Sequence, residues 1–350
     1  MNTPASSALT AEQVCVILLN YSNAPDTITC LRAIAAMSPQ PGLLIVVDNH
    51  SHDDSVDRIL KEWSSFASPV LLRQKENYVP VSPPNVRHLF LLRTANDGFS
   101  AGNNSGIRLA LQNKDCKAVW LLNNDTTPEH EALNALCQRM SQEASLGIVG
   151  STLVYAHGRS TVQALAGSKL NKLLGTTSSL GGGMEIEEAL RQWPPTRVEQ
   201  QLDDIIGASM FIRRTVLEQT GYLDEAFFLY GEETEFCIRV RKAGFNFAWA
   251  PDSIVYHKEG GSTGAESAAE GRKFSRPVWV DYLGLRNRVY MMRKHYPWAL
   301  PLVLLSYLGV MLNRVRRGQA DRIPLVCRAA WDGLRGRMGK PDHLFPALRD

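Results

Sequence analysis

The sequence lacks paired cysteines and a charge excess of either sign. Its six cysteines lie far apart and none belongs to a CxxC pair, which argues against disulfides and a zinc site and indicates reduced thiols in a cytoplasmic protein. The 38 Lys and Arg residues nearly balance the 35 Asp and Glu residues, and the net charge of +3 is too small to indicate nucleic-acid binding. The first residues lack the basic-then-apolar pattern of a signal peptide. We therefore expect a cytoplasmic globular protein with no nucleic-acid partner, long enough at 350 residues for two domains, or for one large domain with an appendage.

Two common nucleotide-binding motifs are missing as well. The stretch of small residues at 96–106, NDGFSAGNNSG, has no Walker lysine and does not match GxGxxG, so neither a P-loop nor a Rossmann fingerprint is supported. We expect this stretch to form a loop that leads into a helix from Ile107, and such a loop can cradle a phosphate or sugar hydroxyls. Asn-rich loops are more often ordinary turns, so this motif alone does not decide between the two.

Short apolar runs rich in branched side chains predict buried strands at 14–19, 43–47, 89–93 and 118–122. Helical spacing follows the first two runs. Strand-then-helix units in succession predict a parallel α/β sheet. Ligands of such sheets bind at the carboxyl ends of the strands, where Tyr21, Asp48 and Asn49 would lie.

An acidic residue follows the strand expected at 118–122, in the sequence Asn123-Asn124-Asp125. A carboxylate at a strand end, flanked by amides, suits a divalent ion that holds a diphosphate. Asn-Asp is equally common in ordinary turns, so both interpretations stay open here. Thr127 and Pro128 then predict the start of a helix, as its N-cap and its first residue.

His257 ends a later strand expected at 254–256, just ahead of glycines and hydroxyl side chains at 260–263. A lone histidine is usually structural or exposed. A neutral imidazole at a strand end could nevertheless complete a metal site with Asp125.

Aromatic residues meet carboxylates in the stretch 224–239, DEAFFLYGEETEFCIR. Gly231 allows a sharp turn between them, and the following residues predict a helix that ends at Gly244. Glu232 and Glu233 would lie at the N-terminus of this helix, where its dipole favours charged carboxylates. Burial beside the aromatic run would raise the pKa of such a carboxyl group, and the sequence leaves open which effect prevails. On its own, the stretch is most simply a stabilising acidic first turn.

The composition changes from Pro277, where aromatic and basic residues share a predicted helix. The apolar run at 298–312 is shorter than the ~20 residues that a membrane-spanning helix needs. Basic residues flank it at 294 and at 314, 316 and 317. A helix in the membrane interface fits this pattern, and a buried core helix or a dimer contact fits it as well. Residues 158–196 are expected to be irregular, as a cover over a site or as an idle surface loop.

Taken in order, these pieces resemble the GT-A-fold glycosyltransferases of family 2, and most closely the bacterial rhamnosyltransferase-like branch. The resemblance spans residue 14 to about residue 295. It rests on the motifs VILLNY, VVDNHSHDDS, NDGFSAGNNSGI, LLNNDT, GASMFIRR, LDEAFFLYGEETEFCIR, IVYHKEGGST and YLGLRNR. It implies an α/β fold with a mixed, mainly parallel, Rossmann-like sheet flanked by helices over residues 1–270. Residues 271–350 would form a C-terminal helical extension.

The resemblance also implies a donor site for a nucleotide sugar. Asp48, in VVDN, would bind the pyrimidine base. Asn96 and Asn103 would line the donor pocket, together with Tyr21 and Asn123.

A metal site and a catalytic base follow from the same resemblance. Asp125 stands where the family has a DxD-like motif and would hold Mg²⁺ or Mn²⁺, with His257 as a further ligand. Glu232 and Glu233 match an acidic pair whose second member is the usual base, which makes Glu233 the expected base. The sequence departs from the family pattern twice: Asn123 replaces the first Asp of DxD, and the second acid is Glu where Asp is commoner.

The resemblance as a whole implies an inverting, metal-dependent transferase. It would move a sugar such as L-rhamnose from a dTDP- or UDP-sugar to a hydroxyl of a growing cell-surface glycan. If the run at 298–317 lies in the membrane interface, the acceptor would be lipid-linked, at the inner face of the cytoplasmic membrane. A homodimer through this run stays open. The alternatives are a nucleotidyltransferase acting on a sugar phosphate and a catalytically inactive nucleotide-sugar-binding protein.

Overall fold

A single large sheet organises the chain. The computed structural model describes residues 8–75, 80–258 and 277–344. Ten strands form the sheet, in the order β3-β4-β2-β1-β5-β12-β7-β13-β6, with β8 beside β7. Its parallel half contains β3 (Val70–Arg73), β4 (His88–Leu92), β2 (Leu43–Asp48), β1 (Val14–Asn20) and β5 (Ala118–Asn123). The other half contains β12 (Ser209–Arg213), β7 (Leu146–Tyr155), β13 (Asn246–His257), β6 (Thr126–Pro128) and β8 (Val162–Leu165).

The mixed character of the sheet arises in this second half. Strand β12 is antiparallel to both of its neighbours, β5 and β7, whereas β13 runs parallel to β7. Because two reversals restore the direction, β7 and β13 point the same way as β1, β2, β4 and β5. The carboxyl ends of all these strands therefore lie along one edge. The expected mixed, mainly parallel sheet is confirmed.

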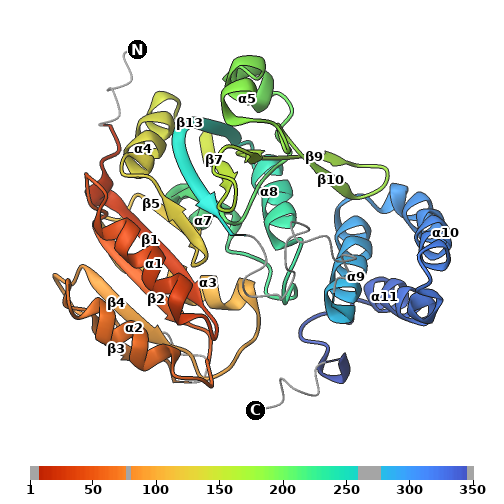
Figure 1. Cartoon of the computed structure of the whole chain (residues 1–350), viewed down its shortest axis with the longest axis horizontal. Coiled ribbons are helices and arrows are strands. Elements are labelled where there is room, and N and C mark those ends of the chain that lie inside the picture. The colour runs from red at the N-terminus through yellow and green to blue at the C-terminus, as the bar shows by residue number, and fades with distance from the viewer. Residues whose placement is uncertain (1–7, 76–79, 259–276, 345–350) are drawn as a thin grey trace.

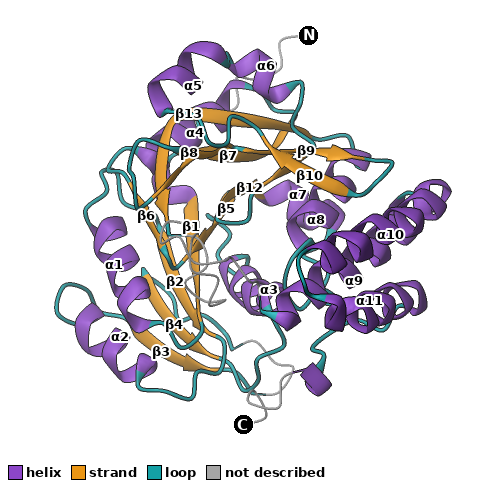
Figure 2. Cartoon of the chain, turned by 45° about the vertical axis from the view of Figure 1, so that its right-hand side comes forward, coloured by secondary structure: helices purple, strands orange, loops and turns teal. Residues whose placement is uncertain are grey.

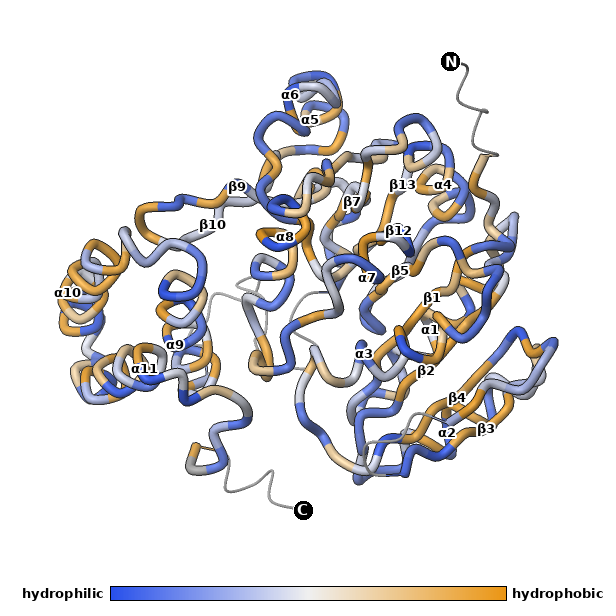
Figure 3. Tube along the Cα trace, turned by 180° about the vertical axis from the view of Figure 1, so that it is seen from behind, coloured by the Kyte–Doolittle hydropathy of each residue, from blue (hydrophilic) through white to orange (hydrophobic). Residues whose placement is uncertain are grey.

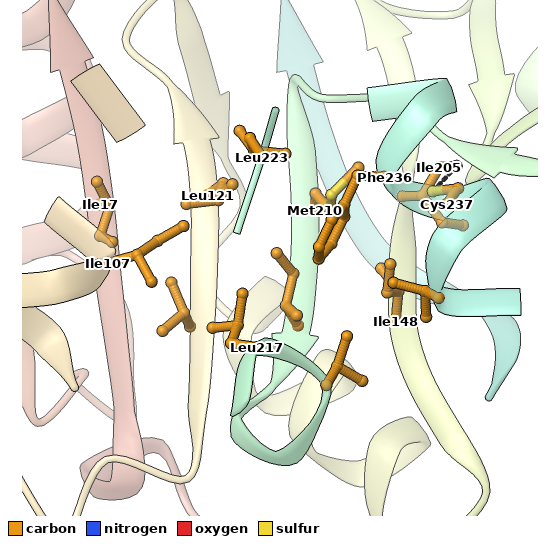
Figure 4. Packing of buried hydrophobic residues seen from close by; sticks show 14 of the residues in the cluster. Ile17, Ile107, Leu121, Ile148, Ile205, Met210, Leu217, Leu223, Phe236 and Cys237 are labelled. Atoms are coloured by element: carbon orange, nitrogen blue, oxygen red, sulfur yellow. Dashed lines mark hydrogen bonds between the residues drawn. The ribbon is translucent and has the colours of Figure 1, made fainter. Parts of the chain in front are cut away.

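Helices cover both faces of the sheet (Figure 1). On one face lie α1 (Ala24–Ala35), α2 (Ser55–Trp63) and α4 (Ala132–Gln142), and on the other lie α3 (Phe99–Ala110), α7 (Arg214–Thr220) and α8 (Glu232–Lys242). Central strands buried on both faces explain why the runs at 14–19 and 43–47 are apolar without alternation. Figure 4 shows the core under the second face, where Leu121 and Met210 of the sheet meet Ile107, Leu217 and Phe236 of these helices.

Helix α3 starts earlier than the sequence predicts. The small residues expected in a loop belong to the helix, which begins at Phe99. A Cβ on Gly102 would lie 2.4 Å from Leu19 Cδ1, and one on Gly106 would lie 2.7 Å from Ile17 Cγ2. The small residues thus let α3 pack closely on β1, and the loop is reduced to residues 96–98.

Residues 158–196 are ordered rather than irregular, so that expectation was wrong. Strand β9 (Gly167–Asn171) pairs with β10 (Thr176–Ser179) and with β11 (Asp204–Ile205) in a second sheet. Helices α5 (Ile186–Gln192) and α6 (Pro195–Glu199) follow the hairpin. The glycines and prolines that suggested irregular structure form the tight connections between these short elements.

The C-terminal residues form three helices, α9 (Val278–His295), α10 (Leu300–Arg316) and α11 (Ile323–Arg335), which pack beside the sheet domain (Figure 2). Only Val303 and Tyr307 of α10 are buried. With the short turn before it, the helix runs from Pro297 to Arg316, and this stretch is long and apolar enough to cross a membrane by length and composition alone. Only 17% of it is buried in the protein, so the expectation of a buried core helix is excluded.

Candidate active site

The predicted site residues gather at the carboxyl edge of the sheet. The backbone N–H of Asn123, at the end of β5, donates to Ala208 O at 3.0 Å, just before β12 begins. A Cβ on the neighbouring Gly207 would lie 3.9 Å from Glu233 Cβ and 3.8 Å from Phe99 Cζ. The acidic helix α8, the start of α3 and the end of β5 therefore meet at one place, on the side where α/β sheets bind ligands.

Asp48 ends β2 and is 2% exposed. Its Oδ1 accepts hydrogen bonds from Asn20 Nδ2 (2.8 Å) and Ser51 Oγ (2.6 Å), and its Oδ2 accepts one from the Ser51 backbone N–H (2.9 Å). Thr27 Oγ1 donates to Asn20 Oδ1 at 2.8 Å and so orients the amide that holds Asp48. Each carboxylate oxygen has two lone pairs, and Oδ2 retains one that can accept an N–H of a ligand.

Asn96 belongs to a second polar network beside the first. Its Oδ1 accepts from Asn49 Nδ2 at 2.9 Å and from the Gly98 backbone N–H at 3.1 Å. Arg93, at the end of β4, donates to Asn49 Oδ1 and bonds Asp97 Oδ2 at 3.0 Å. The buried Arg93 thus orders the loop at 96–98 through Asn49.

The remaining predicted donor residues lie around the same edge. Asn103 is 2% exposed and donates from Nδ2 to Phe99 O at 3.0 Å, one turn earlier in α3. Tyr21 lies just beyond β1 and is half-buried, as is Asn123 at the end of β5. These positions agree with a donor pocket, and their contacts with a ligand stay a prediction.

Asp125 and His257 are brought together by a strand, not by the helix expected at Thr127. Residues 126–128 form β6, which pairs with β13 so that Thr126 lies opposite His257, and α4 begins only at Ala132. The apolar β13 offers an open edge, and pairing there outweighs the helix-start signal of Thr127 and Pro128. His257 Nε2 lies 3.3 Å from Asp125 Oδ1. The glycines and hydroxyl residues expected to follow, at 260–263, lie outside the described residues.

The arrangement of this pair fits a divalent cation. Gln163 Oε1 lies 2.9 Å from His257 Nδ1, so Nδ1 donates its proton to Gln163 and Nε2 faces Asp125, where its unprotonated form can bind an ion. That Nε2 is buried and has no hydrogen-bond partner among the described residues. Burial opposes ionisation of Asp125, but the adjacent His257 and Lys258 outweigh it and hold the pKa of the carboxyl below its usual value.

Two protein ligands make an incomplete shell. Within the part of the chain that the structure describes, no group of three or more His, Cys, Asp or Glu side chains could hold a metal ion. Mg²⁺ and related ions in nucleotide sites are commonly bound by one or two protein groups, with phosphate oxygens and water as the other ligands. Asp125 and His257 therefore fit an ion that is bound together with a diphosphate.

The two glutamates at the start of α8 are both partly desolvated. Glu232 is 3% exposed, and the Oε2 atoms of Glu232 and Glu233 are buried without a hydrogen-bond partner among the described residues. Burial, with the neighbouring Glu233 charge, raises the pKa of Glu232 well above its usual value. Burial also raises the pKa of Glu233 to about 7, with the charge of Asp204 adding to the effect and backbone N–H groups opposing it. Burial thus outweighs the helix dipole in the competition that the sequence left open.

Glu235 has a different environment from this pair. It is fully buried and accepts hydrogen bonds from His295 Nε2 (2.9 Å), Lys294 Nζ (2.8 Å) and Arg239 Nε (2.9 Å). Burial opposes its ionisation, but these partners outweigh it and lower the pKa of Glu235 to about 2. Glu235 is therefore charged at neutral pH, and its bonds to Lys294 and His295 connect α8 to α9.

Chemically, the edge combines two kinds of group. Glu233 is a carboxyl group whose pKa near 7 lets it take up a proton at neutral pH, as a general base must. A divalent ion held by Asp125 and His257 would neutralise negative charge. Sequence reasoning missed Arg93 and Gln163, which orient Asn49 and His257. Arg93 is visible as a cation at a strand end, whereas Gln163 lies in the stretch expected to be irregular.

Comparison with known proteins agrees with this geometry. A sequence model of the family described as "Glycosyltransferase like family 2" matches residues 13–274. The chain belongs to this family, and the predicted resemblance is confirmed.

Two curated relatives cover almost the whole chain. The low-salt glycan biosynthesis hexosyltransferase Agl10 of Haloferax volcanii is 24% identical over 340 residues, which is 95% of this chain and 94% of the relative. The N-acetylglucosaminyl-diphospho-decaprenol L-rhamnosyltransferase of Mycobacterium tuberculosis is 24% identical over 327 residues, or 89% of this chain and 97% of the relative.

Solved structures support the fold. The mannosyltransferase PcManGT of Pyrobaculum calidifontis, in complex with GDP-Man and Mn²⁺, aligns with a TM-score of 0.51 at 14% identity, over 92% of this chain and 87% of that one. GalNAc-T7 with UDP, GalNAc and Mn²⁺ aligns with a TM-score of 0.55 at 11% identity, over 97% of this chain and 56% of that one. At these identities the likeness shows the GT-A fold alone.

The chain is therefore a glycosyltransferase of family 2, in which an inverting mechanism is general. The nucleotidyltransferase alternative is set aside, because the family match covers the whole sheet domain.

Proposed function

We propose that the protein transfers a sugar, with inversion, from a dTDP- or UDP-sugar to a hydroxyl of a lipid-linked, growing cell-surface glycan. The observation that carries this proposal is the proximity of Glu233, with its pKa near 7, to Gly207 and to the end of β5, which leads into Asp125. L-Rhamnose is our first choice of sugar, because the mycobacterial relative is named as an L-rhamnosyltransferase acting on a diphospho-decaprenol.

The donor would lie along the two polar networks. The free lone pair of Asp48 Oδ2 would accept the N–H of a pyrimidine base. The loop at 96–98, with Asn103, Tyr21 and Asn123 around it, would enclose the rest of the nucleotide sugar. The division into a catalytic domain at 1–270 and a helical extension at 271–350 is part of this proposal.

Asp125 and His257 would hold Mg²⁺ or Mn²⁺ against the diphosphate. The ion, when bound, stabilises the negative charge that develops on the leaving diphosphate. Glu233 would accept the proton of the acceptor hydroxyl as that oxygen attacks the sugar carbon. One displacement requires one base, so Glu232, whose pKa is raised well above its usual value by burial and by the Glu233 charge, would be a neighbour of the base and not a second base.

The exposed face of α10 supports a membrane location for the acceptor. Large apolar side chains recur at helical spacing along this face and the short turn before it, and they are 44–63% exposed, namely Trp298, Leu302, Leu305, Leu308, Leu312 and Val315. Figure 3 shows apolar colouring along much of α10. Basic residues follow at the C-terminal end of the helix. We infer a peripheral contact through residues 298–317 with anionic lipid at the inner face of the cytoplasmic membrane.

Donor binding tests the first half of the proposal. Isothermal titration of dTDP- and UDP-sugars, with and without Mn²⁺, should show metal-dependent binding by the wild-type protein. Asp125→Ala should lose the metal dependence, while Asp97→Ala, which removes a carboxylate of the neighbouring loop, should keep it. Equal Mn²⁺ dependence in Asp125→Ala and wild type would disprove the metal site. A wild type that binds donor but neither transfers nor hydrolyses it would support the inactive binding protein.

Vesicle binding tests the second half. The wild-type chain should sediment with vesicles containing anionic lipid, more weakly as salt is added, because screening weakens the basic contribution. The double variant Leu305→Ser with Leu308→Ser should lose most of this binding. Phe66→Ser, which removes an exposed aromatic elsewhere, should not. If the double variant binds vesicles normally, or if it converts a dimer to a monomer, the face is not a membrane contact.

A further inference from the structure

The C-terminal helices fasten the stretch that carries the proposed base. We define the catalytic segment as residues 224–235, which contains the aromatic run, the turn at Gly231 and the acidic start of α8. Residues of the C-terminal extension form hydrogen bonds, here called anchors, along the whole segment. At its ends, Lys294 bonds Asp224 and Glu235, each at 2.8 Å, and His295 bonds Glu235 at 2.9 Å. Between them, the Gly339 N–H donates to Ala226 O at 2.8 Å, and Asn287 donates to Leu229 O and Tyr230 O at 2.9 and 2.8 Å.

Asn287 is the central anchor. It lies on α9 and is 1% exposed. Its Nδ2 donates one proton to Leu229 O and the other to Tyr230 O, and its Oδ1 accepts from Arg286 Nε at 3.0 Å. The bond from Arg286 fixes which end of the amide faces the segment. Both amide protons and the amide oxygen are therefore used, so the side chain has one orientation.

The backbone at these two carbonyls is unusual. Tyr230 has φ 72° and Gly231 has φ 89°, so two consecutive residues are in the left-handed region. A tyrosine adopts that conformation only when surrounding contacts enforce it. Gly231 is also the N-cap of α8, and its carbonyl accepts from the Glu235 N–H at 3.0 Å. The turn held by Asn287 thus sets the direction in which the first helical turn, and Glu233 with it, enters the site.

Other contacts hold the segment from the opposite side. The Phe99 N–H donates to Phe228 O at 2.7 Å, and Asn104 of α3 bonds both the N–H and the C=O of Leu223. Thr234 Oγ1 donates to Asp204 Oδ2 at 2.7 Å. These bonds lie before and after the left-handed turn. Asn287 donates side-chain hydrogen bonds to the carbonyls of Leu229 and Tyr230, within the turn itself.

We propose that Asn287 is a positioning residue for the base Glu233, so that the C-terminal extension takes part in sugar transfer by fixing the left-handed turn before α8. This inference rests on the proposed function. Without the two bonds from Asn287, Tyr230 relaxes toward an ordinary backbone conformation, and the carboxylate of Glu233 moves relative to the donor. Donor binding is unaffected, because the donor networks at Asp48 and Asn96 do not involve the turn.

The main test compares Asn287→Asp with wild type. Aspartate has the same shape and keeps the contact with Arg286, but it donates nothing and places a carboxylate against two carbonyl oxygens. We expect kcat to fall about 100-fold with the donor KM unchanged, since misplacement by about 1 Å can cost that much. Asn287→Ser removes both amide N–H donors without adding charge, and its short hydroxyl does not replace the pair of bonds. It should fold even if the aspartate variant does not, and it should show the same fall in kcat with an unchanged donor KM. Tyr307→Phe is the matched control, because it removes a buried hydrogen bond to Leu285 O inside the extension.

A second measurement separates positioning from mere stability. In single-turnover assays, Asn287→Ser should cost nothing further in a Glu233→Gln background, because a residue that acts through the base has no effect once the base is gone. A full additional loss in that background overturns the proposal, as does a kcat within twofold of wild type for Asn287→Ser. The proposal is also overturned if Tyr307→Phe loses as much kcat as Asn287→Ser.

Hydrogen exchange tests the role of Asn287 without relying on the proposed function, because it needs no transfer activity. Asn287→Ser should speed exchange of the backbone amides at 231–235, and Tyr307→Phe should not. If the wild type transfers none of the sugars tried, the proposed function fails, and the exchange result still decides whether Asn287 orders the turn. Unchanged exchange in Asn287→Ser would refute that ordering.

Discussion

At pH 6, transfer by the wild-type protein should run at about a tenth of its plateau rate, because a base with a pKa of about 7 is then about 9% ionised. A glutamate at its ordinary pKa of 4.5 would be about 97% ionised at the same pH, and its rate would be flat. The assay is kcat/KM for the donor at saturating acceptor between pH 5 and 9. Donor binding is measured at each pH with saturating Mn²⁺, which separates ionisation of Glu233 from any loss of donor binding.

The same burial makes a prediction for stability. A carboxyl group whose pKa is higher in the folded than in the unfolded protein makes the folded state bind more protons. Stability therefore falls as the pH rises from about 4.3 and levels off above about 7. A rise from 4.5 to about 7 corresponds to up to about 3 kcal/mol, at 1.36 kcal/mol per pH unit, and the partial exposure of Glu233 reduces this value.

Glu233→Gln should therefore be more stable than wild type at pH 8 and equally stable at pH 4, as measured by urea unfolding. It should also lose most of its transfer activity. Glu232→Gln is the control, since burial and the charge of Asp204, not Glu232, raise the pKa of Glu233, and it should keep the inflection near pH 7. Two results would show that burial does not raise the pKa of Glu233. One is a wild-type transfer rate that stays flat down to pH 5.5, and the other is a Glu233→Gln protein that is no more stable than wild type at pH 8.

Three further predictions concern residues around the site. Gln163→Leu should weaken Mn²⁺-dependent donor binding about 10- to 100-fold in calorimetry, because the imidazole loses the acceptor that sets its tautomer, and unchanged binding would contradict that role. Gly98→Ala should destabilise the protein by more than about 1 kcal/mol in urea unfolding, since φ is 101° and a Cβ would lie 2.2 Å from a backbone oxygen, whereas exposed Gly284→Ala in α9 should not destabilise it. Glu235→Gln should lose up to about 3 kcal/mol at pH 7 and little near pH 2, because a pKa lowered to about 2 adds stability that is present above about pH 4.3 and lost as the pH falls toward 2. A Glu235→Gln protein as stable as wild type at pH 7 would rule out the tie to α9.

Strands and their ligand-binding edge were predictable because their signal is local. The continuous apolar runs of β1, β2 and β5 are buried on both faces, and each ends in a polar residue that the structure places at the site. The acidic helix was equally visible, since Gly231 and the carboxylates after it mark its start within five residues.

Features that depend on distant partners were not predictable in this way. Thr127 and Pro128 have the local signature of a helix start, but they pair with β13, which is more than a hundred residues away. The start of α3 depends on the backbone of Phe228, which accepts the Phe99 N–H. The pKa of Glu233 is the result of two opposed effects, and only the packed structure gives the degree of burial.

The anchors along the catalytic segment also limit how this chain can be rebuilt. Residues 224–235 share hydrogen bonds with α9 and with the turn at Gly339, and Phe227 packs edge-on against Tyr290. The acidic stretch and the three C-terminal helices therefore form one exchangeable cassette, although 42 residues, 236–277, separate residue 235 from the start of α9. A graft that carries the acidic stretch without the C-terminal helices would bring in Glu233 but not the hydrogen bonds that orient it.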